Sequence, residues 1–379
     1  MKKLRIALFF SSDPSTAGGV QEHIIFLSRE LSKRGHTVDI FGPQTKKRRY
    51  NRYHEIGTIV DMPIPNGNQA NIHLLNSDIT IAELISKKKF DLLHIHEPYA
   101  PFAAWNLIDQ CSLPMVATFH TAWDNKSIVN ILNNLIPFFK EKFSAKMKGA
   151  VYVSHITRNR WRHLCDKTVI QAVIPNAVDT SLFVPKNTIN TIPQLLFTAR
   201  IVHRKGILQL LEAMKIVKQK GYRCMLTVIG DGKERQSMLS YIKKSDLSSH
   251  VTWKGEITGA SRYEYFTNAD IFCAPYKDEA APIAILEAIS AGLPIVGFKN
   301  ESFKESLKNY PGRELIVSHN VQLLANAIMK LLDNKAYIQQ LKEWCLAERK
   351  MFSWESVAQE TEQLYYQAIE KYALTKKGI

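Results

Sequence analysis

The 379-residue sequence lacks several features that would place it in a simple class. Its five cysteines form no CxxC pair and show no metal-ligand spacing, so we expect reduced, mostly buried thiols in a cytosolic protein. No apolar run is long enough to span a bilayer. The apolar run at residues 4–10 breaks at Ser11-Ser12-Asp13 without a clear cleavage site, which predicts a buried strand rather than a secretory leader.

Negative charge is also scarce. Lys and Arg number 50 against 35 Asp and Glu, a formal charge of +15 that both halves of the chain share. Such an excess suits an anionic ligand: a nucleotide, an acidic lipid or a nucleic acid. No RNA-binding aromatic motif is present, so a nucleic-acid partner is not expected.

Short apolar segments alternate with amphipathic ones along the chain. Strands are predicted at residues 6–10, 37–41, 90–96, 115–121, 150–154, 195–199, 225–229, 251–253 and 269–274, and a helix at 21–34. Strand, glycine loop, helix and strand in this order predict an α/β protein with parallel sheets. We expect an N-terminal domain at 1–185, a second domain at 186–353 and a final helix at 354–379.

Residues 278–288, running on to Val296, organise the rest of the sequence. Pro282 suits the first turn of a helix, and Gly292 suits its end. Glu279 then lies in the loop before the helix, and Glu287 lies on its second turn. The unpaired N–H groups of the first turn favour an anion. A sugar attached to a diphosphate and a ribose would match this pattern of an anion site beside two carboxylates.

Two Glu eight residues apart, entering L-E-A-x-x-A-G-x-P-x-V, resemble the signature of the retaining GT-B glycosyltransferases of family 4. The Gly18-Gly19-Val20 loop and R-x-x-x-x-K-G at residues 200–206 also resemble that family. The resemblance implies two Rossmann-like doubly wound domains facing across a cleft, with a C-terminal helix crossing back to the first. It also implies transfer of a hexose from a nucleotide-diphosphate sugar with retention of configuration.

The resemblance assigns roles by position. Glu279 would orient the donor sugar, Arg200 and Lys205 would stabilise the diphosphate, and His120 would contact the sugar. Glu287 would hold the ribose, and the remaining donor-binding positions are the glycine loop and the helix entry: Gly18, Gly19, Ala281, Pro282 and Ile283.

The segments H-I-H-E-P at 94–98 and A-T-F-H-T at 117–121 resemble one branch, the phosphatidylinositol mannosyltransferases. This implies GDP-mannose as donor, phosphatidylinositol as acceptor, and a cytoplasmic enzyme peripheral on the inner face of the cell membrane. His94 and His96 themselves are expected to be structural. Docking on an anionic membrane is predicted from the runs Lys46–Arg49 and Lys87–Lys89 and from a lysine-bordered apolar stripe at Ile128–Met147. The same stripe is equally typical of a helix packed inward.

Two other functions remain open at this stage. The first is a UDP-glucose-dependent transferase acting on diacylglycerol or a polysaccharide. The second is a non-catalytic polyanion-binding protein on a transferase scaffold. No metal-ligand residues and no tightly bound cofactor are expected, because no D-x-D motif is evident and the nucleotide sugar is a co-substrate. Whether a divalent cation assists is not decided by the sequence.

Overall fold

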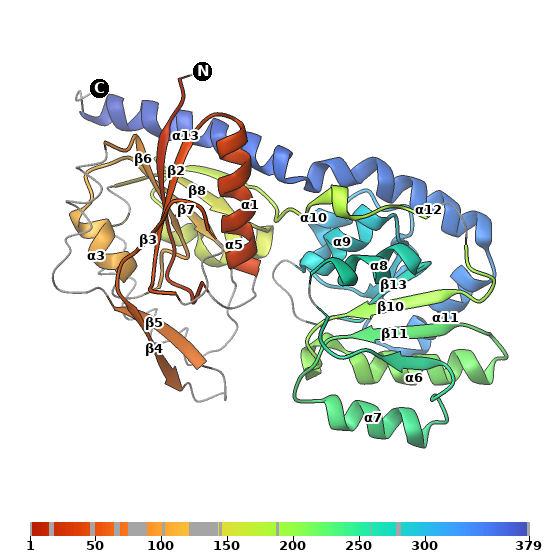
Figure 1. Cartoon of the computed structure of the whole chain (residues 1–379). Helices are drawn as coiled ribbons and strands as arrows, with labels where there is room; N and C mark the ends of the chain where they lie inside the picture. Colours follow the sequence, from red (N-terminus) through yellow and green to blue (C-terminus); the bar gives the residue numbers. More distant parts are fainter. Residues whose placement is uncertain are drawn as a thin grey trace. The chain divides into compact units, whose positions relative to one another are not determined.

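The computed structural model describes residues 2–14, 19–45, 50–63, 69–74, 89–100, 103–120, 143, 146–186, 189–257, 259–277 and 282–376. The chain forms two compact units (Figure 1). The first unit comprises Met1–Asn176 and Trp354–Ile379, and the second comprises Ala177–Ser353. The boundary lies after Asn176 rather than after Pro185, because Val178 and Phe183 are buried in the core of the second unit.

The described part of the first unit contains a seven-stranded parallel sheet in the order β3-β2-β1-β6-β7-β8-β9. Its strands are β1 (Arg5–Phe9), β2 (Thr37–Gly42), β3 (Tyr53–Glu55), β6 (Leu92–His96), β7 (Met115–Phe119), β8 (Met147–Tyr152) and β9 (Ile170–Val173). An antiparallel pair, β4 (Thr58–Pro63) and β5 (Gln69–Leu74), is separate from this sheet. The labelled helices are α1 (Gly19–Lys33), α3 (Ala103–Gln110) and α5 (His155–Trp161).

The second unit repeats the plan with a six-stranded parallel sheet in the order β12-β11-β10-β13-β14-β15. Its strands are β10 (Gln194–Thr198), β11 (Met225–Ile229), β12 (Val251–Trp253), β13 (Ile271–Ala274), β14 (Ile295–Phe298) and β15 (Ile316–Val317). Its helices are α6 (Ile207–Gln219), α7 (Arg235–Lys244), α8 (Ala260–Asn268), α9 (Ile283–Ala291), α10 (Phe303–Ser306), α11 (Val321–Leu332) and α12 (Lys335–Glu348). When the six strands are numbered in the order in which they occur in the chain, their order in the sheet is 3-2-1-4-5-6, which is the strand order of Rossmann-like sheets.

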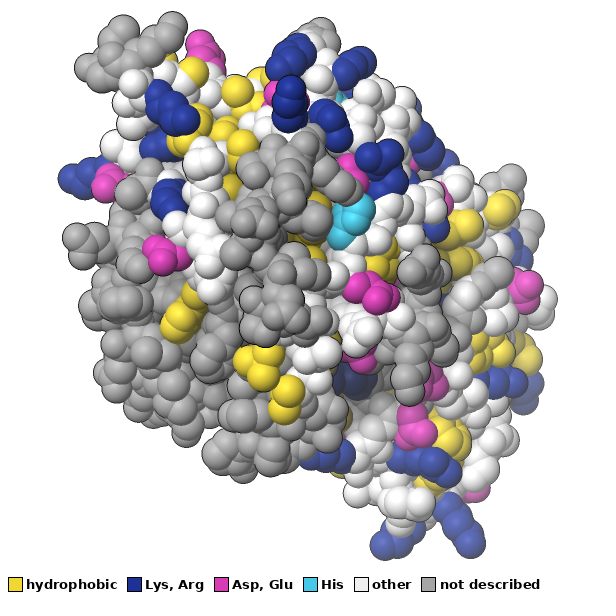
Figure 2. Space-filling view, turned by 60° about the vertical axis from the view of Figure 1, so that its left-hand side comes forward, with side chains coloured by type: hydrophobic (Ala, Val, Ile, Leu, Met, Phe, Trp, Pro, Cys, Tyr) yellow, Lys and Arg dark blue, Asp and Glu magenta, His cyan; other side chains and the backbone are white. Residues whose placement is uncertain are grey.

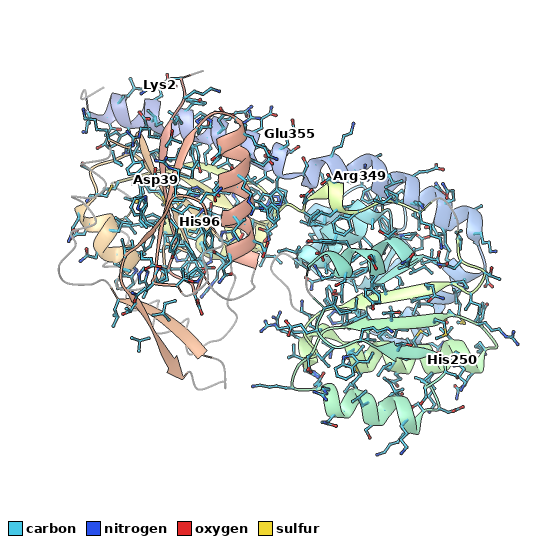
Figure 3. The ribbon with its side chains drawn as sticks, in the orientation of Figure 1. Lys2, Asp39, His96, His250, Arg349 and Glu355 are labelled. Atoms are coloured by element: carbon cyan, nitrogen blue, oxygen red, sulfur yellow. The ribbon has the colours of Figure 1, made fainter. Side chains whose placement is uncertain are left out.

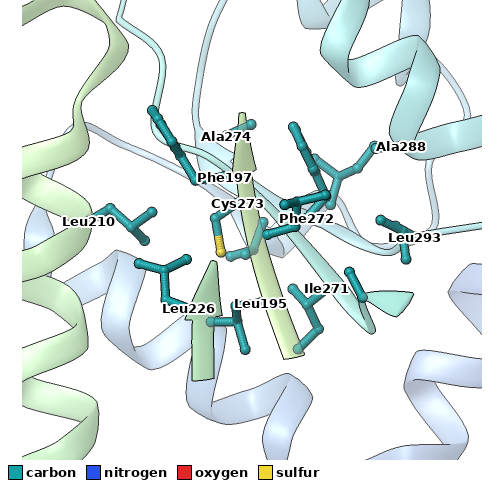
Figure 4. Packing of buried hydrophobic residues seen from close by; sticks show 14 of the residues in the cluster. Leu195, Phe197, Leu210, Leu226, Ile271, Phe272, Cys273, Ala274, Ala288 and Leu293 are labelled. Carbon is teal, nitrogen blue, oxygen red and sulfur yellow. The ribbon is translucent and has the colours of Figure 1, made fainter. Parts of the chain in front are cut away.

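Apolar strands explain both cores. Strands buried on both faces read as continuous apolar runs, and β13 is an example with all four residues buried. Figure 4 shows Ile271, Phe272 and Cys273 of β13 packed among residues of neighbouring strands and helices. All five cysteines are buried and free, as expected from their spacing.

The final helix, α13 (Trp354–Lys376), belongs to the first unit, as predicted. It packs against α1 and β8. Trp354 stacks on Phe26 of α1 with ring centroids 5.3 Å apart, and the Tyr366 hydroxyl donates to the Lys2 carbonyl at 2.7 Å. These contacts explain why residues at the two ends of the chain build one unit.

At the C-terminal end of the apolar stripe at 128–147, the inward-packed alternative holds. Phe143 is buried in the core of the first unit, and Met147 begins β8, so these two side chains face the protein interior. Lys146, which borders the stripe, is half-buried, and its Nζ donates to the Ile108 carbonyl at 2.9 Å. The rest of the stripe, and the runs Lys46–Arg49 and Lys87–Lys88, lie outside the described residues. Among the described helices, none is both long and apolar enough to cross a membrane.

Candidate functional site

The strand orders of the two sheets point to where ligands bind. Each sheet reverses its direction of growth at one place, between β1 and β6 in the first unit and between β10 and β13 in the second. In open α/β sheets, ligands bind beyond the carboxyl ends of the strands at this switch point. Ligands are therefore expected at these two edges.

The edge of the second unit carries two cations after β10. Arg200 lies two residues after the end of the strand and is exposed. Lys205 closes the short 3-10 helix His203–Lys205 and is half-buried, with its Nζ 4.5 Å from the centre of the Tyr276 ring. An ammonium over an aromatic face is attracted by the ring quadrupole, which helps to hold Lys205 beside the segment that follows β13.

A glycine lets these two loops approach closely. Gly206 has φ +70°, and a Cβ placed there would lie 2.1 Å from the Pro275 carbonyl oxygen. The Lys277 N–H donates to the Arg204 carbonyl at 2.9 Å, which joins the two loops. Only glycine fits such an approach with a left-handed backbone. The K-G pair of the motif thus places its lysine next to the loop that leads toward Glu279.

Glu287 lies on α9 and is buried, with its side chain 5% exposed. Arg262 of α8 binds both carboxylate oxygens: its Nη2 donates to Oε2 at 2.5 Å, and its Nη1 donates to Oε1. Burial alone would lower the pKa of Arg262, but the charge of Glu287 and its hydrogen bonds raise it overall. The pair is therefore a fixed, bidentate ion pair.

This pairing leaves part of the Glu287 carboxylate available. An ionised carboxylate has about four lone-pair positions, and a bidentate guanidinium uses two of them. The two that remain match the two hydroxyls of a vicinal diol. Pro282 is the N-cap of α9 and is buried, and Ile283 is the first helical residue. These positions agree with the predicted start of the helix.

The edge of the first unit is rich in histidine. His94 lies within β6, and both of its ring nitrogens have partners: the Tyr365 hydroxyl at 2.6 Å and Thr118 Oγ1 at 2.7 Å. Figure 3 labels its neighbour His96 near α1 in the interior of the unit. His94 is thus a core residue that ties α13 to the sheet, in keeping with the structural role expected for it.

His96 and His120 end neighbouring strands and contact each other. His96 is the last residue of β6, His120 follows β7, and His96 Nδ1 lies 2.9 Å from His120 Nε2. His23 of α1 meets the His120 ring edge-on at 4.7 Å between centroids, and its Nδ1–H donates to Asn176 Oδ1 at 3.3 Å. Burial lowers the pKa of His23 to about 4 and keeps those of His96 and His120 well below the ordinary value. All three imidazoles are therefore neutral at pH 7.

The structure brings some of the predicted site residues together, and others lie outside the described residues. Arg200 and Lys205 share one loop, and His120 lies at the predicted strand end. Gly19 begins α1, whereas Gly18, Glu279 and Ala281 lie outside the described residues. Two residues of these edges, Arg262 and His23, were not predicted from the sequence. No local pattern marks Arg262, but His23 precedes Leu27 by four residues on the buried face of α1, and a histidine in an apolar stripe is a usable signal.

The chain has two parallel Rossmann-like sheets. The second carries cations after its first strand and a buried Glu on a later helix, as expected for a GT-B glycosyltransferase. Residues 17–182 match the family described as "Glycosyltransferase Family 4", and residues 180–345 match the family described as "Glycosyl transferases group 1". Among solved structures, a glycosyltransferase from Rickettsia africae aligns with a TM-score of 0.75 at 16% identity, covering 96% of this chain and 99% of that one. The chain belongs to the GT-B glycosyltransferases of family 4.

Within that family the chain resembles the phosphatidylinositol mannosyltransferase branch. It is 25% identical over 374 residues to the phosphatidyl-myo-inositol mannosyltransferase of Mycobacterium tuberculosis strain H37Rv, covering 96% of each chain. The enzyme of the same description from Mycolicibacterium smegmatis is 26% identical over 339 residues, covering 87% of this chain and 85% of that one. The family predicted from the two-glutamate motif is confirmed.

Proposed function

We propose that this protein is a retaining hexosyltransferase that moves mannose from GDP-mannose to phosphatidylinositol. The observation that carries the proposal is the buried Glu287, held by Arg262 with two lone-pair positions left for a ribose diol. The cationic loop with Arg200 and Lys205 is the matching site for the diphosphate. The printed names of the mannosyltransferase relatives support the choice of sugar and lipid.

The proposed reaction is a front-face exchange at the anomeric carbon. The acceptor hydroxyl oxygen bonds to that carbon while the bond to the β-phosphate oxygen breaks. The leaving phosphate takes the acceptor proton, and the new bond forms on the same face, so configuration is retained. Arg200 and Lys205 neutralise the charge that grows on the departing diphosphate. Glu279 and His120 orient the hexose, and the Gly18-Gly19 loop and the Ala281–Ile283 helix entry bind the donor.

Thermal-shift screening against a panel of nucleotide sugars tests the donor assignment. A ligand at 100 times its dissociation constant stabilises the folded chain by about 2.7 kcal/mol. We expect GDP-mannose to raise the melting temperature more than UDP-glucose does. A larger shift with UDP-glucose would replace the mannose assignment, and no shift with any nucleotide sugar would contradict a donor site.

Glu287→Gln should weaken nucleotide-sugar binding. The amide keeps the shape of the side chain but loses the charge, and losing a charged hydrogen-bonding partner costs about 1.5–3 kcal/mol. Gln is preferred to Ala because it keeps the side-chain volume at this buried position, and thermal melting shows whether losing the charge beside Arg262 also destabilises the fold. Calorimetry on the active donor is the measurement. Equal affinity in wild type and Glu287→Gln would remove the ribose role.

A lipid acceptor requires the enzyme to meet a membrane surface. Figure 2 shows many Lys and Arg side chains on the surface of the described residues. We propose that the runs Lys46–Arg49 and Lys87–Lys89 face an anionic membrane at the inner side of the cell membrane, each cation contributing about 1 kcal/mol near the surface. The burial of Phe143 removes that ring from the docking face.

We therefore expect co-sedimentation with vesicles containing phosphatidylinositol, weakening as salt rises. Replacing Lys87, Lys88 and Lys89 by Ser should reduce it. Lys243 and Lys244, which are exposed at the end of α7, provide the matched control pair. Equal binding to neutral and anionic vesicles, or none to either, would shift the proposal toward a soluble acceptor.

A further inference from the structure

Three histidines from distant parts of the sequence meet at the carboxyl edge of the first sheet. His23 comes from α1, His96 from the end of β6 and His120 from the residue after β7. Each offers one ring nitrogen, and the three nitrogens all lie within 4.8 Å of one another. All three side chains are buried, with exposures of 3%, 0% and 8%.

The chemistry of these side chains suits a metal ion. A histidine binds metal through an unprotonated nitrogen, and a neutral imidazole carries one such nitrogen. Neutral imidazole prefers borderline ions such as Zn²⁺ and Co²⁺, whereas Mg²⁺ and Ca²⁺ prefer oxygen ligands. Three histidines with an open fourth position are one of the known arrangements of zinc.

One further observation supports a metal-binding role for this cluster. His23 donates its Nδ1–H to Asn176 Oδ1, which leaves the lone pair on Nε2. Histidines that bind metal usually donate their other ring N–H in this way.

We propose that His23, His96 and His120 bind one borderline divalent ion, Zn²⁺ being the reference case. The nitrogens of His96 and His120 now share one proton across 2.9 Å. When the ion enters, that proton moves to the other nitrogen of the same ring, and both facing lone pairs turn to the ion. Metal–nitrogen bonds of about 2.0–2.1 Å in a tetrahedral site place two ligand nitrogens about 3.3 Å apart. The His96 and His120 nitrogens therefore need to separate slightly, and any pair of nitrogens near the 4.8 Å limit needs to approach.

The ion would coordinate the imidazole of His120, which is also proposed to contact the donor hexose. The site therefore predicts inhibition: Zn²⁺ and the hexose compete for His120. The metal site itself does not depend on the proposed function, since it follows from the histidines alone. Competition is the additional consequence if both proposals hold.

Calorimetry with Zn²⁺ on chelator-treated full-length protein is the test, supported by the visible spectrum of bound Co²⁺. We expect one ion per chain in the wild type. His96→Asn and His23→Asn should each lose most of the affinity, and Asn176→Ala should weaken it by about 10–100-fold, as for other groups that orient a ligand. His250→Asn in the second unit is the matched control and should bind as the wild type does (Figure 3).

Two results would overturn the proposal. One is the absence of a stoichiometric Zn²⁺ ion in the wild type. The other is unchanged affinity in both His96→Asn and His23→Asn, because binding would then lie elsewhere. Thermal melting of each variant shows whether it is folded. If one histidine variant does not fold, Asn176→Ala still tests the site, because it keeps all three histidine ligands. Binding of Zn²⁺ without any effect of a nucleotide sugar would keep the metal site and weaken only the sugar role of His120.

Discussion

Replacing Arg200 or Lys205 by Ala is expected to lower turnover by about 100-fold or more, which is the effect of removing one preorganised group that stabilises developing charge. Arg200 is exposed and Lys205 is half-buried after β10, so neither truncation opens a cavity in the core. The melting temperature should therefore change little. Initial rates of hexose transfer at saturating donor, compared with melting curves of the same samples, measure both effects.

Arg223 provides the control for this experiment. It is an exposed arginine that precedes β11, so it lies at the amino edge of the same sheet. Arg223→Ala should leave turnover unchanged, because its charge is remote from the carboxyl edge where the diphosphate is expected. If Arg200→Ala and Lys205→Ala both turned over at near-normal rates, the diphosphate role of the loop would be wrong.

Glu362→Ala should destabilise the first unit by about 1.5–3 kcal/mol, because Arg34 and His36 lose a charged hydrogen-bonding partner. Glu362 lies on α13 with its side chain 10% exposed. Arg34 Nε donates to its Oε2 at 2.6 Å, and His36 Nε2 lies 2.9 Å from its Oε1. Urea denaturation and hydrogen exchange of the α13 amides measure the loss.

The contribution of Glu362 also has a defined pH dependence. Burial alone would raise its pKa, but the hydrogen bonds from Arg34 and His36 lower it overall. The folded chain thus holds this proton less tightly than the unfolded chain does. The contribution is complete above the ordinary carboxyl pKa of about 4.3 and is lost as the pH falls below it.

We therefore expect the difference in stability between wild type and Glu362→Ala to shrink in acid. The exposed Glu370 on the same helix is the matched control, and Glu370→Ala should have little effect. A Glu362→Ala variant as stable as the control at pH 7 would show that α13 is held by its apolar contacts alone.

Local patterns were sufficient for most of the fold. The apolar runs of β1, β10, β11 and β13 and the Pro282 and Gly292 signals of α9 predicted these elements to within one or two residues. Six of the described strands were not predicted: β3, β4, β5, β9, β14 and β15. Two of them, β3 with three half-buried residues and β9 with four, show why. Neither has a continuous apolar run, so their pairing depends on neighbouring strands rather than on their own sequence.

The residues of the candidate site also fall into two groups, those that local sequence features predicted and those that depend on tertiary structure. Arg200, Lys205, Glu287 and His120 follow from motifs and from strand ends, which are local features. Arg262 could not be predicted, because its pairing with Glu287 depends on how α8 packs against α9. The contact between His96 and His120 depends on the register of β6 against β7. Both are consequences of tertiary structure.

The central claim is that this chain transfers a hexose from a nucleotide sugar to a lipid. The direct measurement is incubation of the purified protein with GDP-[¹⁴C]mannose and vesicles containing phosphatidylinositol, followed by extraction of the lipid and determination of the anomeric configuration of the product. We expect an α-mannosylated phosphatidylinositol that is absent when Arg200 and Lys205 are both replaced by Ala. Labelled lipid with inverted configuration, or no transfer to any lipid from any donor of the panel, would contradict it.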